Sequence, residues 1–165
     1  MPAVAFEQDT PVVPAAKTFS CAGLDVSRLS NGVTVATVPM DGPQATVGIF
    51  VEGGSQFEDP QSAGSAHALE HMAFKSTPNR SCFRTAREIE GMGAQVSAQA
   101  SREHMAYIGD SIKAHASGVF EILADTVVSP VLYGFPWPHE VVDQRDKIKS
   151  DIAALEGNAQ ALFRL

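Results

Sequence analysis

The chain has 165 residues, which is enough for one domain with its own hydrophobic core. Hydrophobic residues make up 44% and charged residues 19%, as in an ordinary globular protein. The formal net charge of −7 argues against a nucleic-acid-binding protein, which would carry a basic patch. No apolar run reaches the roughly 20 residues of a transmembrane helix, so membrane association is expected only through partner chains. Cys21 and Cys82 lack metal-ligand spacing and are predicted to be free thiols.

Residues 1–22 are predicted to form an extended, proline-rich arm rather than a targeting segment. They include Glu7 and Asp9, and their first basic residue is Lys17, whereas a mitochondrial transit peptide is rich in arginine and poor in acids. We interpret the arm either as a mature terminus left after processing or as a tail that lies on a neighbouring chain. The folded domain is expected to span residues 23–165.

Two strands are predicted at the start of this domain. Asn31 and Gly32 form a typical hairpin turn between short runs of β-forming residues. Residues 33–38 alternate between apolar and polar types, which indicates a strand with one buried face. Residues 45–51 are more continuously apolar, and this composition predicts a central strand.

A His-x-x-Glu-His motif follows, in a segment predicted to be helical. His67 and His71 are four residues apart and would therefore share one helix face, where two imidazoles can bind Zn²⁺. Glu70 would project from almost the same face and could take a proton from a water activated by the ion. The alternative is that these side chains share a solvated helix face without chemistry. Either Ser62 or Ser65 is expected to cap this helix.

The rest of the chain alternates between further helices and strands. Small and polar residues alternate in 94–100, which indicates an exposed, edge-like strand. The order of elements predicts an α+β sandwich in which helices cover one face of a mainly antiparallel sheet. The other predicted elements are a helix at 83–92, a strand at 103–109, a helix at 112–128, a loop at 131–139 and a helix at 140–155.

Several motifs together resemble the pitrilysin family of metallopeptidases. They are V-E-G-G-S-Q-F-E, A-H-A-L-E-H-M-A-F-K-S-T, E-I-E-G-M-G-A and S-R-E-H-M-A-Y, and they occur in the order typical of that family. The resemblance extends from about Leu29 to the end of the chain. It implies a zinc site with His67 and His71 as ligands and Glu70 as the catalytic base.

The resemblance also implies a third zinc ligand on a later helix. In the family this ligand is a glutamate, and a supporting acid precedes it by seven residues. The matching segment of this chain has Asp151 at the ligand position and Gln144 at the supporting position. Aspartate can bind zinc, but it is one methylene shorter, and Gln144 cannot supply a negative charge. The alternative is that Asp151 is a solvated helix residue near Lys147 and Lys149.

Other motifs are similar to one branch of this family. A-F-K-S-T-P-N-R-S, A-S-R-E-H-M-A-Y and K-I-K-S-D-I-A-A-L-E-G-N-A-Q resemble the alpha-type subunits of mitochondrial processing peptidases, which are kin to a core protein of respiratory complex III. Many alpha-type subunits have lost zinc ligands and catalysis. In active relatives the strand that matches 93–98 adds the substrate as an edge strand, with an asparagine where Ser97 stands. Ordinary sheet pairing is the interpretation favoured for this strand.

The resemblance implies two alternative functions. The first is a mainly structural core subunit of complex III, on the matrix side of the mitochondrial inner membrane, with the other complex III subunits as partners. The second is a zinc metalloendopeptidase that cleaves basic presequence peptides together with a beta-type subunit. Family members have two long halves of two similar domains each, and this sequence matches only the first part of one half. It is expected to be either one piece of a split subunit that another polypeptide completes, which is the favoured interpretation, or a truncated sequence.

Overall fold

The computed structural model describes residues 23–130 and 138–156. The predicted arm at 1–22 with Cys21, and most of the predicted loop at 131–139, lie outside these ranges. The chain divides into two units, Met1–Asp41 and Gly42–Leu165.

A β-hairpin is the described element of the first unit. Strand β1 (Asp25–Arg28) pairs antiparallel with β2 (Thr34–Thr37). In the connecting turn, the amide of Val33 donates to the Asn31 side chain at 3.1 Å, and Gly32 has a φ of 90°. Glycine adopts this left-handed conformation without the steric cost that a Cβ would add. The hairpin predicted from Asn31-Gly32 is therefore confirmed.

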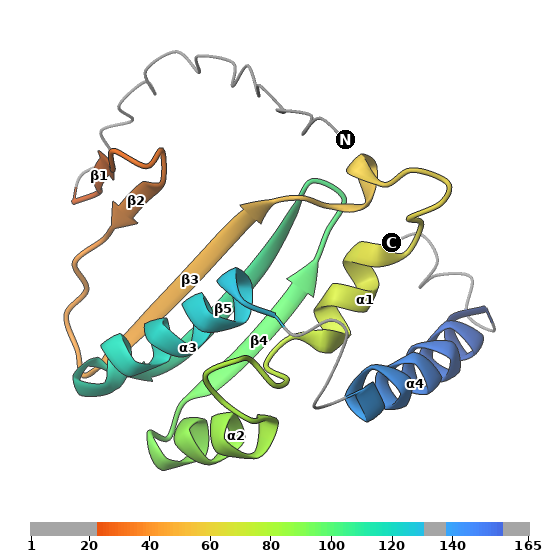
Figure 1. The fold of residues 1–165 in the computed structure, drawn as a ribbon. Helices are drawn as coiled ribbons and strands as arrows, with labels where there is room; N and C mark the ends of the chain where they lie inside the picture. Colours follow the sequence, from red (N-terminus) through yellow and green to blue (C-terminus); the bar gives the residue numbers. More distant parts are fainter. Residues whose placement is uncertain (1–22, 131–137, 157–165) are drawn as a thin grey trace, which may run out of the picture. The chain divides into compact units, whose positions relative to one another are not determined.

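A three-stranded antiparallel sheet forms the centre of the second unit (Figure 1). It consists of β3 (Gln44–Glu52), β4 (Gln95–Ala100) and β5 (His104–Ile112), in the order β3-β5-β4. The prediction that 45–51 is a central strand is wrong for this sheet, because β5 occupies the centre. Alternate residues of β3 are exposed, so only one face of this apolar strand packs against the rest of the unit. The edge position predicted for 94–100 is confirmed.

Helix α3 (Ala116–Val128) packs across β3 and β5 and makes the core. Val119 and Leu123 are fully buried against Met105 and Tyr107. A Cβ on Gly109 would lie 2.4 Å from Val119 Cγ1, so a glycine is required where the helix approaches β5. The predicted start of this helix at residue 112 is wrong. Strand β5 continues to Ile112 because it pairs with β3 along its whole length, and a 3-10 turn, η2 (Lys113–His115), follows it.

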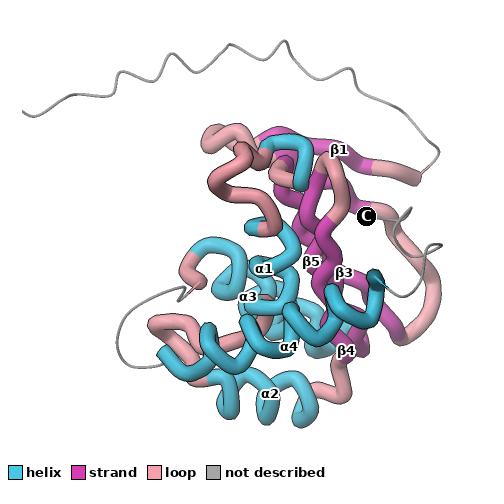
Figure 2. Tube along the Cα trace, turned by 90° about the vertical axis from the view of Figure 1, so that its right-hand side faces the viewer, coloured by secondary structure: helices cyan, strands magenta, loops and turns pink. Residues whose placement is uncertain are grey.

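The remaining helices are α1 (Ser65–Met72), α2 (Cys82–Gly91) and α4 (Pro138–Glu156). Helix α1 contacts both β4 and α4, and a short 3-10 turn, η1 (Ser55–Phe57), precedes it. Figure 2 shows the helices of this unit on one side of the sheet. The predicted α+β class, with helices over one face of a mainly antiparallel sheet, is confirmed. None of the described helices combines the length and apolar character needed to cross a bilayer.

Candidate functional site

The carboxylate of Glu58 caps the first turn of α1. It accepts hydrogen bonds from the amides of Gly64 and Ala66, both at 2.7 Å, and from the hydroxyl of Ser65 at 3.2 Å. The bonds from Ala66 and Gly64 lower the pKa of Glu58. The prediction that Ser62 or Ser65 caps the helix is wrong, because the loop brings Glu58 to the free amides. The Ser62 hydroxyl instead accepts from the Asp59 amide and donates to the Asp59 carbonyl, and the Ser65 hydroxyl donates to Glu58.

The three motif residues share one face of α1, as their spacing predicted. The rings of His67 and His71 meet edge to face with centroids 4.6 Å apart. His67 Nδ1 lies 3.7 Å from Glu70 Oε2. His67 Nε2 is buried and has no hydrogen-bond partner among the residues that the structure describes. A buried polar nitrogen without a partner costs free energy, and an imidazole nitrogen in that condition is well suited to bind a metal ion.

Glu70 is oriented by the end of the edge strand. Its Oε2 accepts the amide of Ala100, the last residue of β4, at 3.2 Å. About a third of the Glu70 side chain is exposed, so the carboxylate keeps contact with solvent. The arrangement places a carboxylate beside His67, at the end of the strand that lies along α1.

Asp151 is the fourth predicted site residue, and α4 brings it to α1. Its Oδ2 lies 3.8 Å from Nε2 of His71. Two ligands of one tetrahedral zinc ion lie roughly 3.3 Å apart, because each bond is about 2.0–2.1 Å long. The pair is therefore close to ligand spacing. Within residues 23–130 and 138–156, however, no three His, Cys, Asp or Glu side chains come close enough together to hold a metal ion. The donor types suit zinc, whereas the spacing of the full set is wider than coordination needs.

The family follows from comparison with known proteins. Residues 34–165 match the family described as Insulinase (Peptidase family M16). The chain belongs to this family. The motifs that indicated a metallopeptidase family are thereby confirmed, and peptidases of the M16 family are typically zinc-dependent.

Relatives of this M16 chain include mitochondrial proteins. The mitochondrial-processing peptidase subunit alpha of Solanum tuberosum is 44% identical over 138 residues, which are 84% of this chain and 27% of that protein. Cytochrome b-c1 complex subunit 1 of Bos taurus is 38% identical over 102 residues, 62% of this chain and 21% of that protein. A crystal structure of a protease from Helicobacter pylori matches with a TM-score of 0.69 and 25% identity, covering 78% of this chain and 30% of that one. The chain thus spans about a quarter of the length of these mitochondrial relatives.

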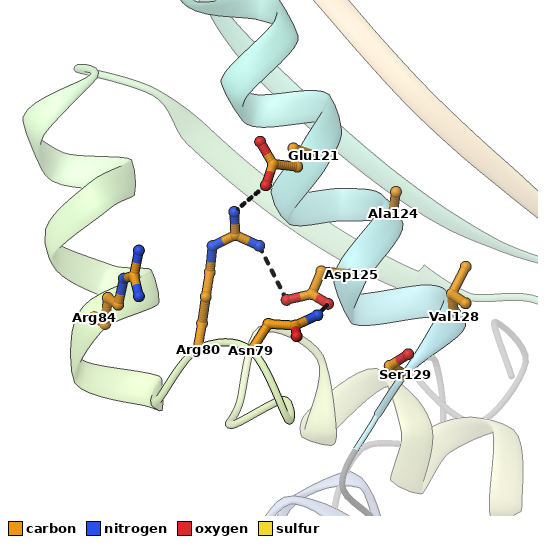
Figure 3. A pocket seen from close by; sticks show the side chains of 8 residues that line it. All are labelled: Asn79, Arg80, Arg84, Glu121, Ala124, Asp125, Val128 and Ser129. Atoms are coloured by element: carbon orange, nitrogen blue, oxygen red, sulfur yellow. Dashed lines mark hydrogen bonds and ion pairs between the residues drawn. The ribbon is translucent and has the colours of Figure 1, made fainter.

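A second polar cluster surrounds Arg80, in the turn between α1 and α2 (Figure 3). Its guanidinium contacts Glu121 at 2.5 Å and both Glu88 and Asp125 at 3.0 Å. Only 12% of the Arg80 side chain is exposed. The hydrogen bond with Glu121 is the main reason that the pKa of Arg80 is raised. Motif reasoning missed this cluster because Arg80 is 41 and 45 residues from two of its partners in the sequence.

Asp125 connects the same turn to α3. It accepts hydrogen bonds at 2.7 Å from the Thr77 hydroxyl and the Asn79 amide, besides its contact with Arg80. Burial opposes its ionisation, but these bonds outweigh burial and lower the pKa of Asp125. An open pocket of about 520 Å³ adjoins the cluster, lined by α3 and the turn. The charged side chains that line the pocket already pair with one another, so the cluster has a structural role: it holds the turn against α3.

Proposed function

We propose that this chain forms the N-terminal portion of an alpha-type subunit of a mitochondrial processing peptidase or of the related complex III core, with a mainly structural role. The alpha branch is supported because the match to the mitochondrial-processing peptidase subunit alpha has higher identity and covers more of the chain than the match to cytochrome b-c1 complex subunit 1. Two positions differ from the family pattern: Gln144 stands where the family has a supporting acid, and Asp151 stands where it has a glutamate ligand. These differences support a structural rather than a catalytic role.

The observation that carries the proposal is the amount of apolar surface that lacks cover. Within the described residues, β3 and β4 each leave one edge unpaired, and large apolar side chains are exposed on several elements. Phe83 on α2 and Val128 on α3 are each 79% exposed, and Phe50 on β3 is 66% exposed. Open edges and apolar surface favour association, so we infer that further family segments and a beta-type subunit cover them. In this proposal at least part of that cover belongs to another polypeptide.

The test is the size and composition of the native complex. Membranes are solubilised, separated on a native gel, and the bands that contain this chain are identified by mass spectrometry. Co-migration with cytochrome subunits or with a beta-type subunit is the expected result. Migration without either of these partners would contradict the proposal.

The second candidate is a zinc metalloendopeptidase that acts on basic presequence peptides together with a beta-type subunit. The unpartnered His67 Nε2 and the 3.8 Å approach of Asp151 to His71 favour it. In this proposal His67, His71 and Asp151 hold Zn²⁺, which when bound supplies Lewis acidity toward a water and a peptide carbonyl. Glu70, oriented by the Ala100 amide, would take the proton from the attacking water and pass it to the leaving amine.

The substitution Glu70→Gln in the whole native assembly tests this second function. It keeps an oxygen that can accept the Ala100 amide but removes the base, so cleavage of a basic presequence peptide should fall by about a hundredfold or more. Glu90→Gln is the matched control, because Glu90 is exposed on α2 and the substitution removes the same single negative charge. An unchanged rate in Glu70→Gln would exclude a catalytic role for this chain.

A further inference from the structure

The position of α4 relative to α1 depends on a contact at the start of α4. Glu140 lies in the first turn of α4, and its carboxylate accepts two hydrogen bonds from Ser76. The Ser76 amide donates to Oε2 at 3.1 Å, and the Ser76 hydroxyl donates to Oε1 at 2.7 Å. Ser76 is 3% exposed. A carboxylate bound by two donors of one buried residue has a defined direction as well as a defined distance.

Ser76 in turn sits on a fixed support. Its hydroxyl accepts the amide of Cys82, the first residue of α2, at 3.0 Å. The next residue, Thr77, donates to Asp125 of α3 at 2.7 Å and accepts the amide of Arg80 at 3.0 Å. The turn that carries Ser76 is thus joined to α2 and α3. Glu140 therefore fixes α4 to the body of the domain rather than to a free loop.

The geometry of α4 connects this contact with the candidate zinc site. Glu140 and Asp151 are 11 residues apart, which is about three turns of helix at 3.6 residues per turn. Both side chains therefore project from the same face of α4, roughly 16 Å apart along the axis. The contact of Asp151 with His71 is 3.8 Å, longer than a hydrogen bond, whereas Glu140 makes two hydrogen bonds. Of these two contacts, the one at Glu140 is better able to hold the helix in place.

We propose that Glu140 is a positioning residue: by binding Ser76 it sets the rotation and height of α4, and so presents Asp151 to His71. The inference rests on the second candidate function, in which Asp151 is a zinc ligand. Glu140 itself does not touch the metal in this proposal. Its role is to keep the third ligand near the two histidines before an ion binds, so that binding does not have to order the helix.

The experiment uses the full chain purified with its bound partners, in three variants. Glu140→Gln removes the charge that Ser76 binds. Asp143→Asn is the matched control, because it removes one charge from an exposed position three residues further along the same helix. Asp151→Asn tests the ligand itself. Hydrogen exchange of the amides of α4, α1 and α3 is measured without metal, and Zn²⁺ affinity is measured by competition with a chelator.

In Glu140→Gln, exchange in α4 should rise about tenfold and Zn²⁺ affinity should fall by a similar factor, since the Ser76 donors lose a charged acceptor and hydrogen bonds to a charged group are stronger than those to a neutral one. Exchange in α1 and α3 should stay unchanged, which distinguishes loss of position from loss of the fold. Asp143→Asn should leave both quantities unchanged. This combination supports the proposal.

Four outcomes would overturn it. The first is unchanged exchange in α4 of Glu140→Gln, and the second is an equal rise in Asp143→Asn. The third is faster exchange in Glu140→Gln with Zn²⁺ affinity intact, while Asp151→Asn lowers that affinity. If Asp151→Asn binds Zn²⁺ as tightly as the unsubstituted chain, the zinc function fails at Asp151, and the positioning role falls with it. The two failures are distinguishable because they appear in different variants.

Discussion

The domain contains two polar clusters, one at Arg80 and one at His67 and His71. At Arg80 the guanidinium binds three carboxylates, and Asp125 binds three donors. At the histidines, His67 Nε2 is buried without a partner within residues 23–130 and 138–156, and the Asp151 carboxylate lies 3.8 Å from His71 Nε2. In the first cluster each guanidinium nitrogen binds a carboxylate of the protein, whereas in the second a buried imidazole nitrogen has no partner among the described residues.

This difference separates a structural cluster from a candidate chemical site. A buried group whose partners are all present stabilises the fold, and a buried group without a partner costs free energy unless something else binds it. The Arg80 cluster should therefore matter to stability, and the histidine cluster should matter to metal binding.

Arg80→Ala should lower the free energy of unfolding by about 3 kcal/mol, because it leaves buried Asp125 without its cation. Urea denaturation followed by circular dichroism measures the change. Arg84→Ala is the control: Arg84 is 62% exposed and pairs with Glu88, so its loss should lower the free energy of unfolding by less than about 1 kcal/mol. Equal losses of unfolding free energy in the two variants would show that the Arg80 cluster does not hold the turn against α3.

Zn²⁺ at a hundred times its dissociation constant should raise the free energy of unfolding by about 2.7 kcal/mol. His67→Phe should abolish this gain. Without metal the same variant should change stability by less than about 1 kcal/mol, since the buried Nε2 has no hydrogen bond to lose. Thermal denaturation with and without Zn²⁺ measures both quantities. A large loss without metal would mean that His67 is a structural residue.

Stability should fall with acid in a way that depends on Asp125. The pKa of Asp125 is lowered in the folded chain from its ordinary value of 3.8, so the unfolded chain binds more protons in this range. The stabilisation is present above pH 3.8 and is lost as the pH falls toward the folded pKa. Urea denaturation at a series of pH values from 6 to 3 (roughly the range of carboxyl titration) should give a shallower acid slope in Asp125→Asn. The same slope in both chains would contradict the prediction.

Glu58→Gln should have the smallest effect. The variant keeps one acceptor oxygen for the first turn of α1 but loses the charge that the Gly64 and Ala66 amides stabilise. Hydrogen exchange in the first turn of α1 should become faster, while exchange in α3 stays the same. Ser62→Ala is the control, because the side chain of Ser62 bonds to Asp59 rather than to the helix. Faster exchange in the first turn of α1 in Ser62→Ala would show that Ser62 caps the helix and would contradict the prediction.

Local patterns predicted the elements well where the cause is local. The hairpin at Asn31-Gly32 follows from a turn that glycine makes easy, and α2 begins after Ser81, whose side chain accepts the amide of Arg84. The cap of α1 was predicted incorrectly because Glu58 precedes the helix by seven residues, beyond the reach of the usual capping patterns. The centre of the sheet was also predicted incorrectly. Apolar composition marks burial of a strand, but the pairing of β3 and β4 with β5 comes from the whole chain.

The site shows the same division. The spacing of His67, Glu70 and His71 determined that they share a helix face, because the α-helix repeats every 3.6 residues. The sequence also determined the family, through motifs that the comparison confirms. Only the tertiary structure decided that Asp151 lies 3.8 Å from His71, and that Glu140 and Ser76 hold its helix. These contacts join residues 64 to 80 positions apart, and no local rule of spacing fixes where two helices meet once the chain has packed.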